Sequence, residues 1–324
     1  MATIKDVAQA AQVSPAAVSR VLNRDDNISV TPEVRMRIMR AAHDLGYVPP
    51  KQRRGVVQGR LSIGVADWHM VRRDRPNVRL SSLRLLVQMM TDQYDVEFVR
   101  LSYGETRRVD GVIAFGFFTS EEMDFLRAVS YHIVFINSDR RDYEYDQVQV
   151  DFDRGLRQIT EYLLDLKRYT SVGYIGGLYE SGTVRIGYHR LEGLRRILEE
   201  RGIYDPGTFH VGELSRDSGY QLAMQAVERG QLAEAMLLGS DEVAEGALEA
   251  FREKGLRIPK DVAVVIYQDI ETLESRWPTG TCVEMIPDYV WQNAIELLLD
   301  RIGGKRSQAV TVVVPTHIKI GDTT

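Results

Sequence analysis

Apolar residues recur at two different periods along the 324-residue chain, and the period changes near residue 60. Before that point they are spaced three and four apart, as on one face of an amphipathic helix, beginning with Ile4, Val7, Ala8 and Ala11. After it, short apolar runs (61–66, 111–115, 133–136, 172–176, 235–238, 262–266) alternate with helical stretches that include 154–166, 186–201, 218–229 and 243–254. The pattern predicts a small all-helical head followed by an α/β body with parallel sheets.

Helix-start signals divide the head into three helices. Thr3 and Asp6 have the spacing of a capping box, and Ser14 followed by Pro15 is a typical N-cap with proline in the first turn. A third helix begins with Thr-Pro-Glu at 31–33 and ends at Gly46. Its expected inward residues are Val34, Ile38, Ala41, Ala42 and Leu45. Two short helices joined by a turn, with a third behind them, predict a helix-turn-helix domain.

The second of these helices has two different faces. Its apolar side is formed by Val18, Val21 and Leu22. The opposite side carries Ala16, Arg20 and Asn23. The guanidinium of Arg20 is able to grip guanine O6 and N7, and Ala16 suits a thymine methyl group. A three-helix bundle that binds another protein would have the same spacing, so spacing alone leaves both functions open.

Charge separates the head from the body. Residues 1–60 hold ten Lys or Arg against five Asp or Glu, a net of +5 in a chain whose net charge is −5, so the body carries −10. A basic head on an acidic body indicates that only the head meets a polyanion. No apolar run reaches the roughly 18 residues of a membrane helix, and the start MATIKDVAQA is unlike a secretory signal. The single cysteine, Cys282, is expected to pack in the core, and a cytoplasmic protein is expected.

The segment IKDVAQAAQVSPAAVSRVLN, with GYVP after it, closely resembles the DNA-binding head of the lactose/galactose repressor (LacI/GalR) family. The resemblance spans residues 2–49 almost without gaps. It implies that Pro15, Ala16 and Arg20 read the operator bases. It also implies phosphate contacts from Thr3, Ser19 and Asn23. Ala17 departs from the family, which usually has Thr there, and this removes a hydroxyl close to the DNA backbone.

In this family the stretch after the head forms a hinge helix on DNA, and a leucine wedges into the minor groove. The corresponding stretch, 50–60, has Val56 in place of the leucine and Pro50 in place of the usual asparagine. Val56 still supplies an apolar wedge, and Arg53 and Arg54 suit a narrow minor groove or phosphates. The alternative is a solvated basic linker without an ordered helix.

The body is similar to the same family's effector domain, which is related to periplasmic sugar-binding proteins. The matching segments are VDGVIAFG, VGYIGG, RLEGLRRILEERGI, GSDEVAEGALEAFREKGLRIPKDVAVV and VVVPTHIKI. The fold so implied is a two-lobed, periplasmic-binding-protein-like α/β effector domain preceded by a small all-α helix-turn-helix head. Its expected domains are the head at 1–49, the hinge at 50–60 and the effector-binding and dimerisation domain at 61–324. The glycines of VGYIGG are expected to form a tight strand-to-helix turn.

Effector-binding residues follow from this resemblance by position. Arg190 matches the family's main effector-anchoring arginine, and Ser240-Asp241 matches a strand-end pair that bonds effector hydroxyls. Asp241 is also placed to cap the helix after it. The other expected positions are Trp68, Asn137, Arg185, Asp269 and Trp277. Either Trp would stack on a sugar ring, although a single Trp is also common in ordinary packing.

One departure concerns the ligand. Gln268 stands where the family usually has the first of two aspartates, so one acidic contact becomes an amide. Gln268-Asp269 together with Trp68 resembles the galactose or β-galactoside branch of the family.

No nucleotide-binding, metalloprotease or serine-hydrolase motif occurs, and the six histidines lack metal-ligand spacing. We therefore expect no enzyme, cofactor or metal site. The sequence favours a ligand-controlled transcriptional repressor that binds a pseudo-palindromic double-stranded DNA operator as a homodimer, without a tetramerising tail or a membrane partner. A small galactoside-like sugar is the expected inducer. Two alternatives stay open: a regulator that uses a purine or a carrier protein as corepressor, and a sugar-binding transport module.

Overall fold

The computed structural model describes the chain except for residues 1, 23–29, 46, 48–59, 68–91, 95, 105–106, 117, 138–144, 182–183, 268–278 and 285–286. It divides into two compact units. The first holds the described parts of Met1–Asn77, Leu83–Gln149 and Asp288–Val312, and the second those of Val150–Pro287 and Val313–Thr324. Among the described residues, no helix has the length and apolar character needed to cross a membrane.

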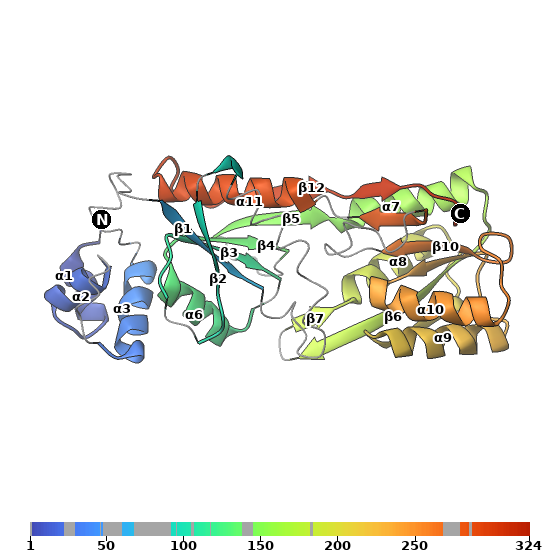
Figure 1. Ribbon diagram of the computed structural model, residues 1–324, viewed down its shortest axis with the longest axis horizontal. Coiled ribbons are helices and arrows are strands. Elements are labelled where there is room, and N and C mark those ends of the chain that lie inside the picture. Colours follow the sequence, from blue (N-terminus) through green and yellow to red (C-terminus); the bar gives the residue numbers. More distant parts are fainter. Residues whose placement is uncertain are drawn as a thin grey trace. The chain divides into compact units, whose positions relative to one another are not determined.

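The head consists of helices α1 (Ile4–Ala10), α2 (Pro15–Leu22) and α3 (Pro32–Asp44) (Figure 1). Both predicted start signals are confirmed. Thr3 and Asp6 form the capping box, and the Ser14 hydroxyl accepts from the Ala17 N–H at 3.1 Å. The helices enclose a core of Val7, Ala8, Ala11, Val18, Val21, Leu22, Ile38, Met39, Ala41, Ala42 and Tyr47.

One residue of the head was placed wrongly by its spacing. Leu45 lies beyond the end of α3 and is 39% exposed, because the helix ends at Asp44. Met39 and Tyr47 occupy the core instead. The predicted helix end at Gly46 lies outside the described residues.

The first unit also contains a six-stranded sheet in the order β12-β5-β4-β3-β1-β2. Its strands are β1 (Leu61–Ala66), β2 (Val96–Arg100), β3 (Gly111–Phe115), β4 (Ile133–Ile136), β5 (Asp146–Asp151) and β12 (Thr311–Pro315). The pairs from β2 to β5 are parallel, as the sequence predicted. Helices α6 (Ser120–Val129) and α11 (Pro287–Ile302) lie on opposite faces of the sheet (Figure 1).

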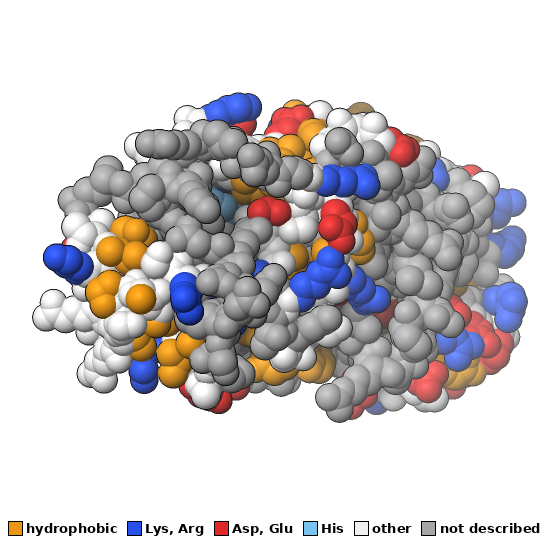
Figure 2. Space-filling view, turned by 60° about the vertical axis from the view of Figure 1, so that its left-hand side comes forward, with side chains coloured by type: hydrophobic (Ala, Val, Ile, Leu, Met, Phe, Trp, Pro, Cys, Tyr) orange, Lys and Arg blue, Asp and Glu red, His pale blue; other side chains and the backbone are white. Residues whose placement is uncertain are grey.

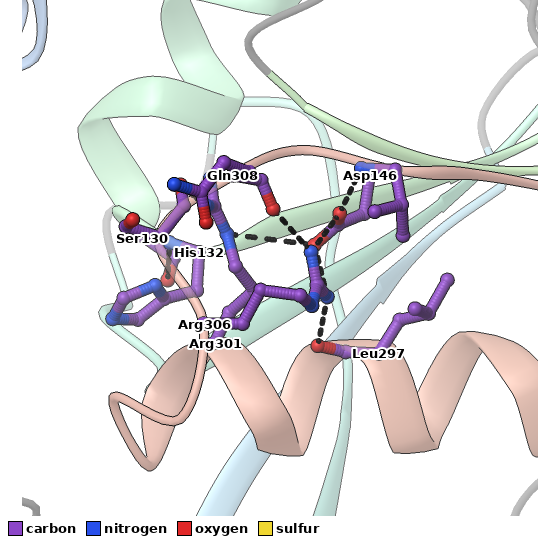
Figure 3. Close-up of polar contacts among 9 residues, drawn as sticks. Ser130, His132, Asp146, Leu297, Arg301, Arg306 and Gln308 are labelled. Atoms are coloured by element: carbon purple, nitrogen blue, oxygen red, sulfur yellow. Dashed lines mark hydrogen bonds and ion pairs between the residues drawn. The ribbon is translucent and has the colours of Figure 1, made fainter.

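The carboxylate of Asp146, at the start of β5, is fully buried and binds the segment that connects α11 to β12 (Figure 3). Its two oxygens accept from the guanidinium of Arg306 at 2.6 and 2.9 Å, and Oδ1 also accepts from the Val310 N–H at 2.8 Å. Nε of Arg301 lies 3.4 Å from Oδ2. Both arginine side chains are largely buried, so the charge of Asp146 is compensated inside the protein.

The second unit contains a sheet in the order β13-β11-β10-β9-β6-β7, with β8 paired to β6. Its strands are β6 (Val172–Ser181), β7 (Val184–Ile186), β8 (Phe209–Glu213), β9 (Ala235–Leu238), β10 (Ala263–Tyr267), β11 (Thr281–Glu284) and β13 (His317–Lys319). Its helices are α7 (Phe152–Glu161), continued by a π-helical turn (Tyr162–Leu166), α8 (Tyr188–Glu200), α9 (Arg216–Glu228) and α10 (Asp241–Glu253), with a short 3₁₀ turn at Pro206–Thr208.

Strands β9 and β10 are buried on both faces, which explains their continuous apolar sequences. Leu237 and Val265 pack into the core that α7 and α8 cover. Leu238 and Val264 pack into the other core, beneath α9 and α10. Alternate residues therefore serve opposite layers, and the expected α/β architecture is confirmed.

The tight turn expected at VGYIGG is wrong. Strand β6 continues through both glycines to Ser181 and then pairs antiparallel with β7. A Cβ at Gly176 would overlap the ring of Tyr174, and one at Gly177 would overlap the backbone of Leu214. The glycines are needed for close packing within the sheet rather than for a turn.

Replacing Asp146 with Asn should lower the free energy of unfolding of the first unit by about 3 kcal/mol, because two largely buried guanidinium groups lose their counter-charge. Equilibrium urea unfolding, followed by tryptophan fluorescence and circular dichroism, measures this loss. Asp165→Asn is the matched control: its carboxylate also binds an arginine through both oxygens, to Arg201 at 2.9 Å, but is half exposed. Water screens that pair, so the control should lose much less. Equal losses would show that burial of Asp146 is unimportant.

Candidate DNA interface and ligand-binding group

Helix α2 turns its apolar side into the head and leaves the opposite side exposed. Val18, Val21 and Leu22 are at most 1% exposed. Pro15, Ala16 and Arg20 are exposed, and Ser19 is half-buried. The two-faced pattern predicted for this helix is therefore present, except for Asn23, which lies outside the described residues. A short helix that exposes an arginine beside small side chains fits into a DNA major groove.

The turn before α2 is held by a contact that the sequence pattern did not reveal. Gln12 adopts a left-handed conformation with φ of 53°, which turns the chain sharply after α1. Nε of Arg37, in α3, donates to the carbonyl of Ala11 at 2.7 Å. This bond links α3 to the carboxyl end of α1 and so fixes where α2 begins. The spacing of apolar residues gave no signal for it, because Arg37 lies on the polar part of its helix.

Thr3 lies at the exposed amino end of α1, but its hydroxyl is already engaged. It donates to Oδ2 of Asp6 at 2.8 Å, and the Thr3 N–H donates to the same oxygen at 2.7 Å. These two hydrogen bonds hold the pKa of Asp6 below its usual value, and the bond from the backbone N–H has the larger effect. A phosphate contact from Thr3 would therefore have to be made beside a charged carboxylate.

The remaining expected DNA contacts, Arg53, Arg54 and Val56, lie outside the described residues. On the face shown in Figure 2, the described Lys and Arg side chains are interspersed with hydrophobic ones rather than gathered in one basic patch.

Three of the expected ligand-binding residues come together in the second unit, at the carboxyl ends of β9 and β10. Ser240 and Asp241 follow β9, and both are buried. The Ser240 hydroxyl accepts from the Val243 N–H at 3.3 Å and caps α10. Arg190, in the first turn of α8, donates to the carbonyl of Gly239, and its guanidinium lies 4.8 Å from the ring centre of Tyr267. Carboxyl ends of parallel strands are where ligands bind in open α/β sheets.

Aromatic side chains that were not among the expected ligand-binding residues lie next to this group. The ring of Phe152, at the start of α7, lies 5.6 Å from that of Tyr267 and 6.4 Å from that of His189. Tyr267 is the last residue of β10, directly before the expected contacts at 268–269, and this position was a signal that could have identified it. A guanidinium, a carboxylate and aromatic faces together suit a ligand with many hydroxyls.

Arg185 is not part of this group. Its guanidinium lies 3.8 Å from the ring centre of Tyr188 and 3.9 Å from a carboxylate oxygen of Glu192. The side chain is half exposed on β7, close to the end of the β6–β7 hairpin. Its described contacts give it a place on the surface of the hairpin.

In the first unit, Asn137 follows β4 in a left-handed conformation (φ 52°), and its N–H donates to the Val148 carbonyl at 3.0 Å. Asp67 follows β1 at the same edge of the sheet and pairs with Arg100 at 3.1 Å. No motif in the sequence indicated that pair. The other expected positions, Trp68, Asp269 and Trp277, lie outside the described residues.

Cys282 is buried, as expected. Burial, followed by the nearby Glu284 carboxylate, raises the pKa of its thiol to about 12, so the thiol is protonated at neutral pH and is not a nucleophile. Within the described part of the chain, no three His, Cys, Asp or Glu side chains are grouped as metal ligands.

Comparison with known proteins gives matches over the whole chain. The family model described as bacterial regulatory proteins, lacI family, matches residues 3–50, and a periplasmic binding protein-like domain matches residues 160–324. The HTH-type transcriptional repressor MelR of Bacillus subtilis (strain 168) is 32% identical over 341 residues, which cover 100% of this chain and 96% of MelR.

Solved structures agree in fold. A complex of the transcriptional regulator CelR with cellobiose has a TM-score of 0.65 and 25% identity, covering 100% of both chains. The lac repressor dimer bound to operator and the anti-inducer ONPF has a TM-score of 0.65 and 23% identity, covering 100% of this chain and 99% of that one.

Proposed function

The chain belongs to the lacI family of bacterial regulatory proteins and is a DNA-binding transcriptional regulator, and from this premise we propose that it is a repressor released from its operator by a small sugar. In this proposal residues 1–49 form the DNA-binding head, 50–60 the hinge and 61–324 the effector-binding and dimerisation domain. A protein that binds operator DNA in a bacterial cell acts in the cytoplasm.

The observation that carries the proposal is the exposed face of α2. Pro15, Ala16 and Arg20 stand out from a helix whose other side is buried, and Arg20 has the fork that reads guanine. Ser19, Thr3 and Asn23 would bind phosphates on either side. Arg53 and Arg54 would hold the minor groove where Val56 wedges into it.

The ligand side of the proposal rests on the group around Arg190. Its guanidinium, the carboxylate of Asp241 and the rings of Tyr267 and Phe152 supply polar and stacking contacts for a sugar. Ser240 lies in this group, and Asp269 and Trp277 would complete it. The relative CelR was solved with cellobiose, which supports the sugar class. A galactoside remains our first choice of sugar because of Gln268-Asp269.

Release of DNA follows from unequal binding. A sugar that binds the DNA-free conformation more tightly than the operator-bound one shifts the population toward release, by an amount set by the ratio of the two affinities. Two heads on a symmetric dimer match a pseudo-palindromic operator, and the related lac repressor was solved as an operator-bound dimer.

The direct test is fluorescence anisotropy of the purified protein on a labelled palindrome from its own promoter, with galactose, lactose, cellobiose and purines added in turn. Salt is held constant, because phosphate contacts make operator affinity steeply salt-dependent. We expect one sugar to release the DNA. Tighter binding with a purine would replace induction by corepression. Failure to bind any palindrome in all conditions would contradict the proposal.

Arg20→Ala should weaken operator binding by about 1–3 kcal/mol and relax the preference at one base pair of each half-site. Arg20→Lys is the matched variant, because it keeps the charge but loses the planar fork. It should keep the salt dependence of binding and still lose the base preference. An unchanged preference in both variants would remove Arg20 from base reading.

Arg190→Ala should abolish the response to sugar and leave operator affinity within about twofold of wild type, since it removes a ligand contact and not a DNA contact. Isothermal titration with the inducing sugar and anisotropy on the operator measure the two effects separately. Arg195→Ala, an exposed arginine of the same helix that pairs with Glu199, is the control and should respond normally. Loss of DNA binding in Arg190→Ala would make Arg190 a structural residue.

A further inference from the structure

Two side chains from the α/β part of the first unit reach into the helical head. Arg108, shortly before β3, donates to the carbonyl of Val21 in the last turn of α2, and its second terminal nitrogen lies 3.2 Å from the sulfur of Met39 in α3. Tyr131, between α6 and β4, packs against the hydrophobic core of the head. Helices α3 and α6 lie side by side (Figure 1).

The contact made by Arg108 suits the chemistry of a helix end. The last carbonyl groups of an α-helix have no partner within the helix, and the carboxyl end carries a partial negative charge. A guanidinium placed there makes a charge-assisted hydrogen bond and stabilises the helix end. Arg108 therefore binds the very helix whose other side carries the expected base contacts.

Burial adds an apolar component to this contact. The Tyr131 hydroxyl is enclosed, and burial raises its pKa far above the usual value. Tyr47 of the head is near enough to raise that pKa further, while the positive charge of Arg108 acts against the rise. A weaker, exposed pairing of Arg40 with Asp124 at 3.8 Å lies at the rim. An apolar centre with charges around it is the usual composition of a protein interface.

The contact leaves the expected DNA-reading face of α2 accessible. Pro15, Ala16 and Arg20 remain exposed while Val21, at the other end of the helix, is bound. The head is therefore held in an orientation that presents this face rather than covers it.

We propose that the surface formed by Arg108, Asp124 and Tyr131 is a docking site for the chain's own DNA-binding head, and that Arg108 is a positioning residue that orients α2 for operator binding. The proposal rests on operator binding as the function. It gives the effector domain a direct contact with α2, through which a change in the first unit alters DNA affinity.

The first experiment measures docking without DNA, by hydrogen–deuterium exchange of the full-length protein. Arg108→Gln should speed amide exchange in α2 and α3 by about tenfold, because a charge-assisted hydrogen bond is lost. Arg107→Gln is the matched control: the neighbouring arginine is half exposed and pairs with Glu97. It should exchange like wild type. Equal exchange in both variants would overturn the proposal, whether or not an operator has been found.

The second experiment measures operator affinity over a series of salt concentrations. Arg108→Gln should bind about tenfold more weakly with an unchanged salt slope, because Arg108 orients α2 and touches no phosphate. A slope reduced by about one would make Arg108 a phosphate contact. Tighter binding would mean that docking inhibits the head, and an unchanged affinity would mean that it has no role. Each of these three results overturns the proposal.

Tyr131 provides variants that separate docking from loss of fold. Its buried hydroxyl has no hydrogen-bond partner in the described structure, so Tyr131→Phe should dock at least as well as wild type. Tyr131→Asp places a charge in the apolar centre and should release the head, with the same faster exchange in α2 and α3. Exchange in β3 and β4 must stay as in wild type, which shows that the sheet remains folded. Release of the head by Tyr131→Phe, or its retention by Tyr131→Asp, would contradict the docking site.

Discussion

The buried carboxylate of Asp146 binds at the start of two strands that, in the described part of the chain, lead out of the first unit. Strand β5 leads into α7 of the second unit, and β12 leads into β13. Both strands are fixed at their first-unit ends by the contacts of Asp146 with Arg306, Arg301 and the Val310 N–H. Loss of any of these contacts would leave buried charge uncompensated, which is strongly destabilising.

In the second unit, the proposed ligand contacts lie at the carboxyl ends of two central strands. Strands β9 and β10 lie between two layers of helices, so their side chains are buried in the two cores. A ligand can therefore meet these strands at their carboxyl ends. Gly239 and Ser240 follow the carboxyl end of β9, and Tyr267 is the last residue of β10. Arg190 joins them from α8, because its helix begins close to that edge of the sheet. The group proposed to bind the ligand therefore lies where the packed core ends.

Helix α2 of the head likewise has one buried side and one exposed side. One side of α2 packs in the core of the head, and the other side, which carries the proposed DNA contacts, is exposed. Two arginines from outside α2 bind the backbone at its ends: Arg37 of α3 at the turn before it, and Arg108 of the α/β part at its carboxyl end. Through the proposed contact of Arg108, the effector domain acts on α2 directly, and not only through the segment that connects it to the head.

The sequence by itself determined the class of fold, the three helices of the head, strands β1, β3, β4, β6, β9 and β10, helices α7 to α10, the caps at Thr3 and Ser14, and the family, because these depend on local spacing and on short motifs. The other strands and helices α6 and α11 were not predicted from it. It also singled out Arg190, Ser240 and Asp241, since each stands in a motif at an element end, and the structure brings these three together. Only the tertiary structure decided the contacts between residues far apart in the chain: Arg37 with Ala11, Arg108 with Val21, Asp146 with Arg306, and Tyr267 beneath Arg190. The structure also showed that the glycines of VGYIGG lie within β6 and not in a turn, and that Leu45 is exposed and not in the core. The spacing of residues in the sequence does not distinguish these cases. Periodicity reports which side of an element is buried, but not which side chain of another element buries it.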